Sequence, residues 1–99
     1  MESDKIFDAL ASRPRRQVLA YLAEAELTTS ELAERLSLSP PSTSRHLSVL
    51  ENAGLVASER RGQRVLYRIN RDTLVGTLSE FALAICPESP APKKPRESI

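Results

Sequence analysis

The stretch SLSPPSTSRHLSVLENAGLV, residues 37–56, constrains the fold of this chain more than any other. Its first half has the serine and proline content of a linker, while its second half has leucines at helical spacing and closes on a glycine and two apolar residues. Ser39 is a favourable N-cap, and Pro40 and Pro41 would follow it in the first turn, where backbone N–H groups have no partner inside a helix. The prolines therefore begin a helix, and Gly54 ends it as a C-cap residue.

This predicted helix has two unlike faces. At about 100° per residue, Thr43, Leu47 and Leu50 fall on one side, which we expect to be buried. The other side is short and polar, carries one arginine, and is formed by Pro41, Ser42, Arg45, Ser48 and Val49, with Ser44 and His46 at its boundaries. A helix with such small exposed side chains can approach another macromolecule closely.

Capping and hydrophobic spacing predict the remaining elements. We expect helices over 4–11 and 12–23, the second capped by Ser12, and a short helix that begins at a capping box of Thr28 and Glu31. A β-hairpin follows over 55–70, and a last helix is capped by Asp72 and ended by Pro87. The predicted fold is mainly α with a small β-hairpin wing, in the order α-α-α-α-β-β-α. This is a winged helix-turn-helix, with LSLS as its turn.

Positive charge is concentrated in the middle of the chain. The net charge is only +1, but residues 39–71 hold six arginines against two glutamates, a net charge of +4. In the hairpin, alternation predicts an inner face formed by Val65, Tyr67 and Ile69. The outer face is arginine-rich and is formed by Arg64, Leu66 and Arg68. Arginine suits phosphates and guanine edges, although a merely solvated charged face is the alternative interpretation.

The pattern predicts double-stranded DNA as the partner. The second helix of a helix-turn-helix enters the major groove by its N-terminal residues, and its N-terminus favours a phosphate. Arg45 is placed to bind a guanine. The predicted DNA-binding residues are Ser39, Pro40, Pro41, Ser42, Ser44, Arg45, His46 and Ser48 of the helix, and Arg60, Arg61, Gln63 and Arg64 of the wing. The alternative is a winged-helix module that binds protein instead of DNA, for which Val49 and Pro41 would be the suitable surface residues.

The length of 99 residues predicts one domain, over 1–87, followed by a disordered tail rich in proline and lysine over 88–99. A domain of this size buries a limited core, so we expect a second copy to cover further apolar surface. The predicted homodimer interface lies on the first and last helices and comprises Ile6, Phe7, Leu10, Leu74, Leu78, Phe81 and Ile85. The sequence predicts no signal peptide and no membrane insertion, and therefore a cytoplasmic protein.

Reactive side chains are scarce. The single cysteine and single histidine predict neither an intrachain disulfide nor a metal site, and the three glycines lack the spacing of a phosphate loop. We therefore expect no enzyme, no catalytic residue and no cofactor. Cys86 is either an inert thiol or a candidate redox sensor, which would form a disulfide with Cys86 of a second copy across a dimer axis or be modified singly. His46 is either a phosphate contact or a pH sensor.

Three blocks resemble the ArsR/SmtB family of winged-helix transcriptional repressors: FDALASRPRRQVLAYL, TTSELAERLSLSPPSTSRHLSVLENAGLV and ERRGQRVLYRIN, within residues 6–86. The resemblance implies a homodimer that occupies an inverted-repeat operator until a signal lowers its affinity. Metal-sensing members carry a cysteine pair in the third helix, or histidines and carboxylates on the last. This chain has neither set, which implies a non-metal signal. The RRGQ wing is similar to the sporulation-delay autorepressor subgroup, in which a regulatory protein partner relieves repression.

Overall fold

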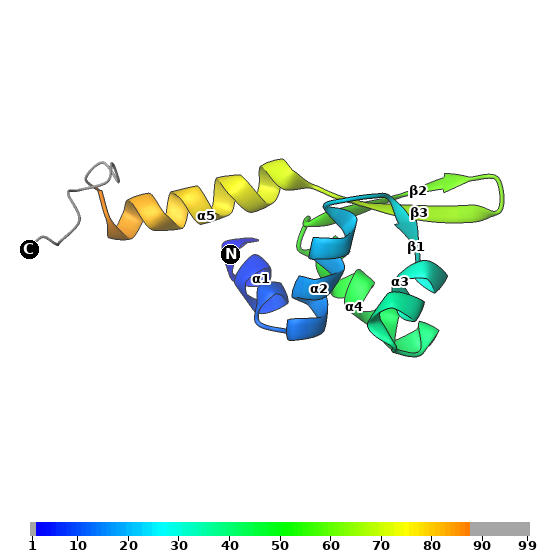
Figure 1. Cartoon of the computed structure of the whole chain (residues 1–99). Coiled ribbons are helices and arrows are strands. Elements are labelled where there is room, and N and C mark those ends of the chain that lie inside the picture. The colour runs from blue at the N-terminus through cyan, green and yellow to red at the C-terminus, as the bar shows by residue number, and fades with distance from the viewer. Residues whose placement is uncertain (1, 88–99) are drawn as a thin grey trace, which may run out of the picture.

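The computed structural model describes residues 2–87, and within them five helices and three short strands follow one another along the chain (Figure 1). In chain order they are α1 (Glu2–Leu10), α2 (Arg13–Leu22), β1 (Leu27–Thr28), α3 (Thr29–Leu36), α4 (Pro40–Asn52), β2 (Val56–Arg61), β3 (Arg64–Ile69) and α5 (Arg71–Ile85). The predicted winged helix-turn-helix order is confirmed, with one strand added. The predicted tail over 88–99 lies outside the described residues.

Local capping explains both ends of α4. The hydroxyl of Ser39 accepts a hydrogen bond from the N–H of Ser42 at 3.2 Å, and the helix begins at Pro40 as predicted. At the other end Gly54 has a φ of 79°, which favours glycine. The N–H of Gly54 donates to the Glu51 carbonyl and the N–H of Leu55 to the Leu50 carbonyl, both at 2.9 Å. This is the hydrogen-bond pair of a Schellman motif, so the helix ends where its glycine permits.

The other helix starts follow the sequence signals except at α5. The capping box before α3 is present: the N–H of Glu31 donates to the Thr28 hydroxyl at 3.2 Å, and the N–H of Thr28 to the Glu31 carboxylate at 2.8 Å. The prediction that Asp72 caps the last helix is wrong. The N-cap residue is Asn70, without a side-chain hydrogen bond, and Asp72 lies in the first turn. The N–H of Asn70 is bonded to the carbonyl of Leu55 at 2.8 Å, so α5 begins directly after β3.

The wing is part of a three-stranded antiparallel sheet in the order β1-β3-β2. A two-residue turn connects β2 to β3, and Gly62 at its first position has a φ of 64°, as a two-residue hairpin requires. The sequence did not indicate β1, whose Thr28 lies opposite Leu66. The prediction that Leu66 lies on the outer face is wrong, since it is only 9% exposed. Both α3 and β1 contact β3, the strand to which Leu66 belongs.

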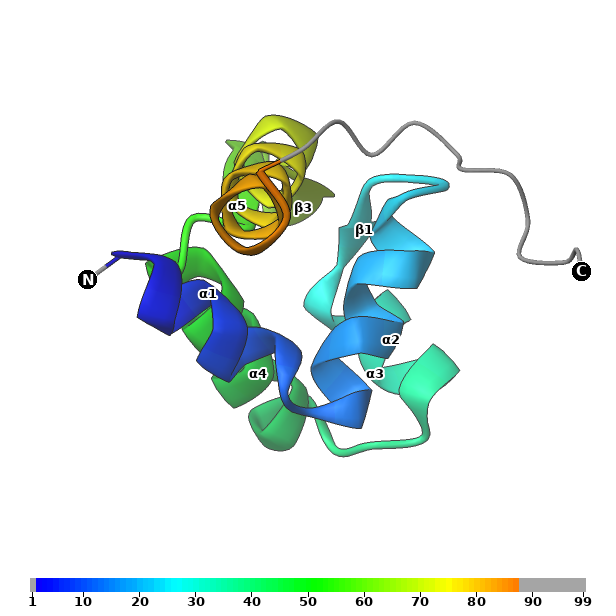
Figure 2. The same cartoon turned by 90° about the vertical axis from the view of Figure 1, so that its left-hand side faces the viewer.

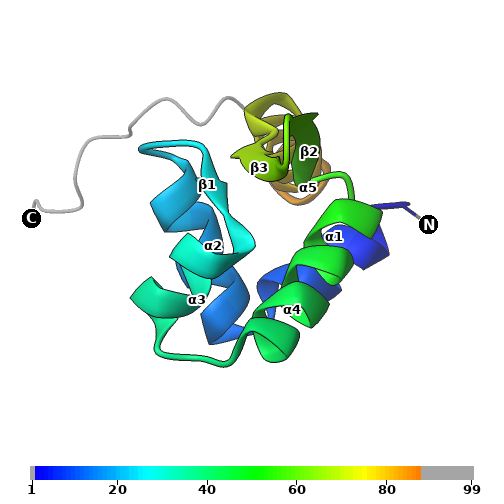
Figure 3. The same cartoon turned by 90° about the vertical axis from the view of Figure 1, so that its right-hand side faces the viewer.

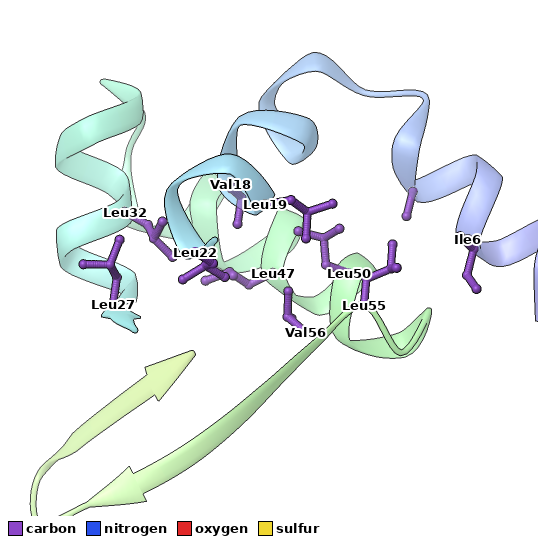
Figure 4. Packing of buried hydrophobic residues seen from close by; sticks show 11 residues of the cluster. Ile6, Val18, Leu19, Leu22, Leu27, Leu32, Leu47, Leu50, Leu55 and Val56 are labelled. Atoms are coloured by element: carbon purple, nitrogen blue, oxygen red, sulfur yellow. The ribbon is translucent and has the colours of Figure 1, made fainter. Parts of the chain in front are cut away.

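One hydrophobic core joins the first four helices to the base of the wing (Figure 4). Its members come from α1 to α4, β1, β2 and the residue before β2, and they are Ile6, Ala9, Val18, Leu19, Leu22, Leu27, Leu32, Leu47, Leu50, Leu55 and Val56. The turn between α3 and α4 lies on the side of the molecule away from α5 (Figure 3). Seen along α5, helix α1 passes beneath it (Figure 2). In the part of the chain described, no helix is both long and apolar enough to cross a membrane.

Candidate nucleic-acid interface

The exposed face of α4 has the composition that the helical wheel predicted. Thr43, Leu47 and Leu50 are buried, and the hydroxyl of Thr43 donates to the Ser39 carbonyl at 3.0 Å. Most of the predicted DNA-binding residues of this helix are exposed, namely Ser39, Pro40, Pro41, Ser44, Arg45 and Ser48. Ser42 and His46 are half-buried at the edge of that face. Helix α4 therefore presents short hydroxyl side chains, two proline rings and one guanidinium.

The N-terminus of α4 differs from the anion site that the sequence suggested. Pro40 and Pro41 have no N–H, and the N–H of Ser42 is already bonded to the Ser39 hydroxyl. The first three positions of the helix therefore leave no backbone donor for a phosphate. The expectation that backbone N–H groups at this helix start bind a phosphate is corrected, and binding here depends on side chains.

His46 lies where α4 meets the first two helices. The Nη1 atom of Arg15, at the start of α2, is 3.4 Å from the Nδ1 atom of His46. Burial lowers the pKa of His46, and the positive charges of Arg15 and Arg45 lower it further. The imidazole is therefore held in its neutral form near pH 7. No local pattern indicates this contact, because the two residues are 31 positions apart.

Carboxylates surround the arginines on one face of the wing. The Nη2 atom of Arg61 lies 3.2 Å from Oε1 of Glu26 and 3.2 Å from Oε1 of Glu59. The hydrogen bond from Arg61 to Glu59, together with the charges of Glu59 and Glu26, raises the pKa of Arg61. Arg68 lies 3.9 Å from the same Glu59 oxygen. These ion pairs are exposed, so each contributes little energy and a phosphate can replace the carboxylate.

The wing tip also reaches α3. The Nη2 atom of Arg64 lies 3.6 Å from Oε2 of Glu31, whose other oxygen accepts the Thr28 N–H. That backbone hydrogen bond is the main cause that lowers the pKa of Glu31. Alternation along β2 directs Arg60 to the opposite face from Arg61, and Arg60 donates to the Gly62 carbonyl at 3.3 Å. The predicted DNA-binding residues of the wing, Arg60, Arg61, Gln63 and Arg64, are all exposed and remain accessible to a ligand.

The acidic partners of the wing were missed at the sequence level. Glu26 reaches Arg61 only because β1 pairs with β3, and a two-residue strand leaves no alternating pattern to detect. Glu59 enters the sequence analysis only as a charge that offsets the six arginines. Its position was readable, since alternation places residue 59 on the same face of a strand as residue 61.

An apolar stripe runs along α5, all of which lies in the described region, and none of its side chains is buried. Leu78, Phe81 and Ile85 are 42%, 49% and 60% exposed. Phe81 contacts half-buried Phe7 of α1 edge-to-face, with ring centroids 5.1 Å apart. The stripe thus continues from α5 onto α1, which is where the sequence predicted a dimer interface.

Three of the predicted interface residues take part in this chain's own packing. Ile6 is 3% exposed and belongs to the core, so the prediction that it contacts a second copy is corrected. It points inward because α1 turns a different side, that of Phe7, toward α5. Leu10 and Leu74 are half-buried and pack against the core. Phe7 and the remaining α5 residues stay as the predicted interface.

Cys86 is exposed and is the C-cap residue of α5. Its N–H donates to the Ala82 carbonyl at 2.7 Å. Among the residues that the structure describes, no three His, Cys, Asp or Glu side chains gather into a group that could hold a metal ion. The thiol lies at the end of α5 and His46 lies on α4, so they form no common site.

A helix-turn-helix with a small polar second helix, flanked by an arginine-bearing hairpin, defines the chain as a winged helix-turn-helix of the DNA-binding kind. Residues 12–58 match the family described as "Bacterial regulatory protein, arsR family". The transcriptional repressor SdpR of Bacillus subtilis is 30% identical over 77% of this chain and 84% of its own length. The chain belongs to the ArsR family of bacterial transcriptional regulators.

Solved structures agree with this assignment. An ArsR-like transcriptional regulator from Rhodococcus sp. RHA1 has a TM-score of 0.82 and 30% identity, over 87% of this chain and 79% of its own. The homodimeric winged helix-turn-helix DNA-binding domain of a possible ArsR-family regulator from Mycobacterium bovis has a TM-score of 0.71 and 28% identity, over 85% and 79% of the two chains. Some other curated relatives are longer, and the chain spans about half of their length. The predicted family resemblance is confirmed, and with it a regulator rather than an enzyme.

Proposed function

We propose that two copies of this chain bind an inverted-repeat operator in double-stranded DNA and repress transcription in the cytoplasm until a non-metal signal releases them. One observation carries the proposal: a single domain combines the small polar face of α4 with the exposed arginines of the wing. A groove about 12 Å wide admits a helix whose leading side chains are short. The wing then contacts the DNA backbone beside it.

The residues of α4 divide between bases and phosphates. Pro41, Ser42, Ser44 and Arg45 lie in the first turns of the helix and would contact base edges, with Arg45 the candidate for a guanine. Ser48 and His46 lie farther along or at the flank and would contact phosphates. The predicted DNA contacts of the wing would meet the DNA backbone or the minor groove, and they are Arg60, Arg61, Gln63 and Arg64. Arg61 and Arg64 would exchange their carboxylate partners for phosphates.

The apolar surface of α5 supports the homodimer. Phe7 and Phe81 form one continuous patch with Leu78 and Ile85, and a second copy that matches it would remove these side chains from water. A two-fold axis at this patch would place the two α4 helices on successive major grooves, about 34 Å apart. The homodimeric state of the related Mycobacterium bovis domain supports the same arrangement.

The signal is proposed to be a partner protein, a small ligand or a change at Cys86. The segment of α3 has no cysteine and α5 has no histidine, so the ligand sets of the two metal-sensing types are missing from the sequence. The exposed thiol at the end of α5 is the candidate redox sensor, since two such thiols would approach each other near a dimer axis. The subgroup resemblance favours a regulatory protein instead.

Fluorescence anisotropy tests the function directly. The DNA upstream of the gene for this protein and a scrambled duplex of equal length are titrated at two salt concentrations. We expect tighter binding to the upstream DNA, with two chains per site. Equal, salt-sensitive binding to both duplexes would argue against this operator, and the absence of binding to either would favour the protein-binding alternative, in which exposed Val49 contributes to the surface.

The redox arm repeats the titration with reductant and after mild oxidation. Cys86→Ser is the matched control, since serine keeps the shape without the thiol. A loss of operator binding on oxidation that Cys86→Ser abolishes would make Cys86 the sensor. Equal binding in both conditions would leave a partner protein or a small ligand as the signal.

A further inference from the structure

Within residues 2–87, Arg15 is the only side chain that links α1, α2 and α4 by hydrogen bonds. Its Nε atom donates to the Ala9 carbonyl at 2.8 Å and its Nη2 atom to the Asp8 carbonyl at 3.1 Å, both at the end of α1. The remaining nitrogen, Nη1, points at Nδ1 of His46 at 3.4 Å. Two of the three bonds anchor the guanidinium, so the third has a defined direction.

The chemistry of this contact settles the state of the imidazole. A guanidinium has five N–H donors and no acceptor, and it stays protonated in proteins. Nδ1 of His46 must therefore accept, so in the neutral ring the proton is on Nε2. In the described part of the chain no hydrogen bond engages Nε2. The ring thus offers an N–H donor beside the exposed face of α4.

Position and charge favour this state over the alternatives. On the helical wheel His46 lies at the edge of the exposed face, one helical turn after Ser42. The charged groups that face the ring are Arg15 from α2 and Arg45 from α4, and both disfavour the imidazolium. Neutral N–H groups are among the donors that bind DNA phosphates, so the Nε2–H group of a neutral imidazole held in one orientation can bind a phosphate oxygen at the flank of the groove.

We propose that Arg15 is a positioning residue for DNA binding, which holds the ring of His46 in the tautomer and orientation that direct Nε2–H at a DNA phosphate. The inference rests on the proposed function, because it assigns Arg15 a role in operator binding. Arg15 does not touch the DNA in this arrangement. Its bonds to α1 also make the orientation of the ring depend on the helix that carries Phe7.

Nitrogen-15 NMR of the free protein is the first test, since the chain has a single histidine. We expect wild type to show a protonated Nε2, an unprotonated Nδ1 and a titration midpoint below 6.5, the ordinary value. Arg15→Met should move the midpoint part of the way back, because burial remains. Arg16→Met is the matched control: Arg16 also donates to an α1 carbonyl, that of Leu10 at 2.7 Å, but makes no hydrogen bond to His46.

Operator binding is the second test. A histidine ring released from Arg15 samples two orientations that exchange Nε2 with a carbon, so about half of the rings would present the donor. With two protomers per operator, Arg15→Met should weaken binding about fourfold, and Arg16→Met less than about twofold. When combined with His46→Gln, which leaves no ring to orient, Arg15→Met should have no further effect. Thermal unfolding of each variant checks that it folds.

The outcomes separate the inference from the function. If wild type prefers its operator but Arg15→Met causes the same loss with and without the His46→Gln substitution, the inference is overturned and the function stands. A protonated Nδ1 in wild type, or the same titration in wild type and Arg15→Met, would also overturn it. Wild type without any operator preference would overturn the proposed function, and the role of Arg15 in DNA binding with it.

Discussion

Leu78 lies in the middle of the apolar stripe of α5 and is 42% exposed in the single chain. Full burial of a leucine side chain contributes about 1.5–3 kcal/mol. A partner can cover only the part still exposed, which corresponds to about 0.6–1.3 kcal/mol per protomer and twice that in a symmetric dimer. Leu78→Ala should therefore raise the dissociation constant of the dimer about 8- to 60-fold, at about 1.4 kcal/mol per factor of ten. Alanine is the best helix former, so α5 itself should persist.

Leu83 provides the matched control for this prediction. It is on the same helix and is 52% exposed, but it lies about 140° around the helix from Leu78, outside the stripe. Sedimentation equilibrium of wild type, Leu78→Ala and Leu83→Ala measures the three dissociation constants. We expect Leu83→Ala to resemble wild type. If Leu83→Ala weakens the dimer as much as Leu78→Ala, the stripe is not the interface and the reasoning from exposure is wrong.

Four further predictions concern the DNA-binding surface and the elements that support it. Arg45→Ala should weaken operator binding by about 1–3 kcal/mol and relax discrimination at one base pair, measured with a panel of single-base operator variants; an equal loss on all duplexes would make Arg45 a phosphate contact. Arg61→Ala should weaken binding almost uniformly and reduce the salt slope by about one, seen in titrations across salt concentrations. Gly54→Ala should cost about 1 kcal/mol or more in urea unfolding, because its φ of 79° strains any other residue. Glu31→Gln should destabilise the protein at pH 7 and progressively less as the pH falls below 4.5, as urea unfolding across this pH range would show. Folding lowers the pKa of Glu31, so its carboxylate stabilises the fold above the ordinary value of 4.5, and this contribution is lost as the pH falls through the folded value.

The sequence predicted those features of the fold that depend on neighbouring residues, such as helix caps and helix faces. The start of α4 at Ser39, its end at Gly54 and the capping box at Thr28 depend on residues within five positions of one another, and all three are present. The two faces of α4 follow from helical periodicity alone. The prediction for Asp72 failed because a second influence competed with the local signal: the pairing that ends β3 determined where the helix begins.

Contacts between distant segments could not be predicted in this way. The strand β1 is too short to show alternation, so neither its pairing beside Leu66 nor the ion pair between Glu26 and Arg61 could be foreseen. The contact between Arg15 and His46 depends on how α2 packs against α4, which a wheel for one helix does not describe. The candidate DNA-binding residues were therefore identified from the sequence. The groups that contact them, Arg15 beside His46 and the glutamates beside the wing arginines, could be identified only from the three-dimensional structure.

The junction between wing and last helix is a single residue, Asn70, and both sides of it are held by hydrogen bonds. Its N–H donates to the carbonyl of Leu55 at 2.8 Å, and the guanidinium of Arg71 donates to the carbonyl of Ala23 at 2.7 Å. In the proposed dimer these two bonds would restrain the orientation of α5 relative to the wing and the rest of the domain. One extra base pair between half-sites turns the second site by about 35° around the duplex, so we expect an operator with that spacing to bind the dimer more weakly. The proposed dimer would therefore select an operator by the spacing between its half-sites as well as by its affinity for each half-site.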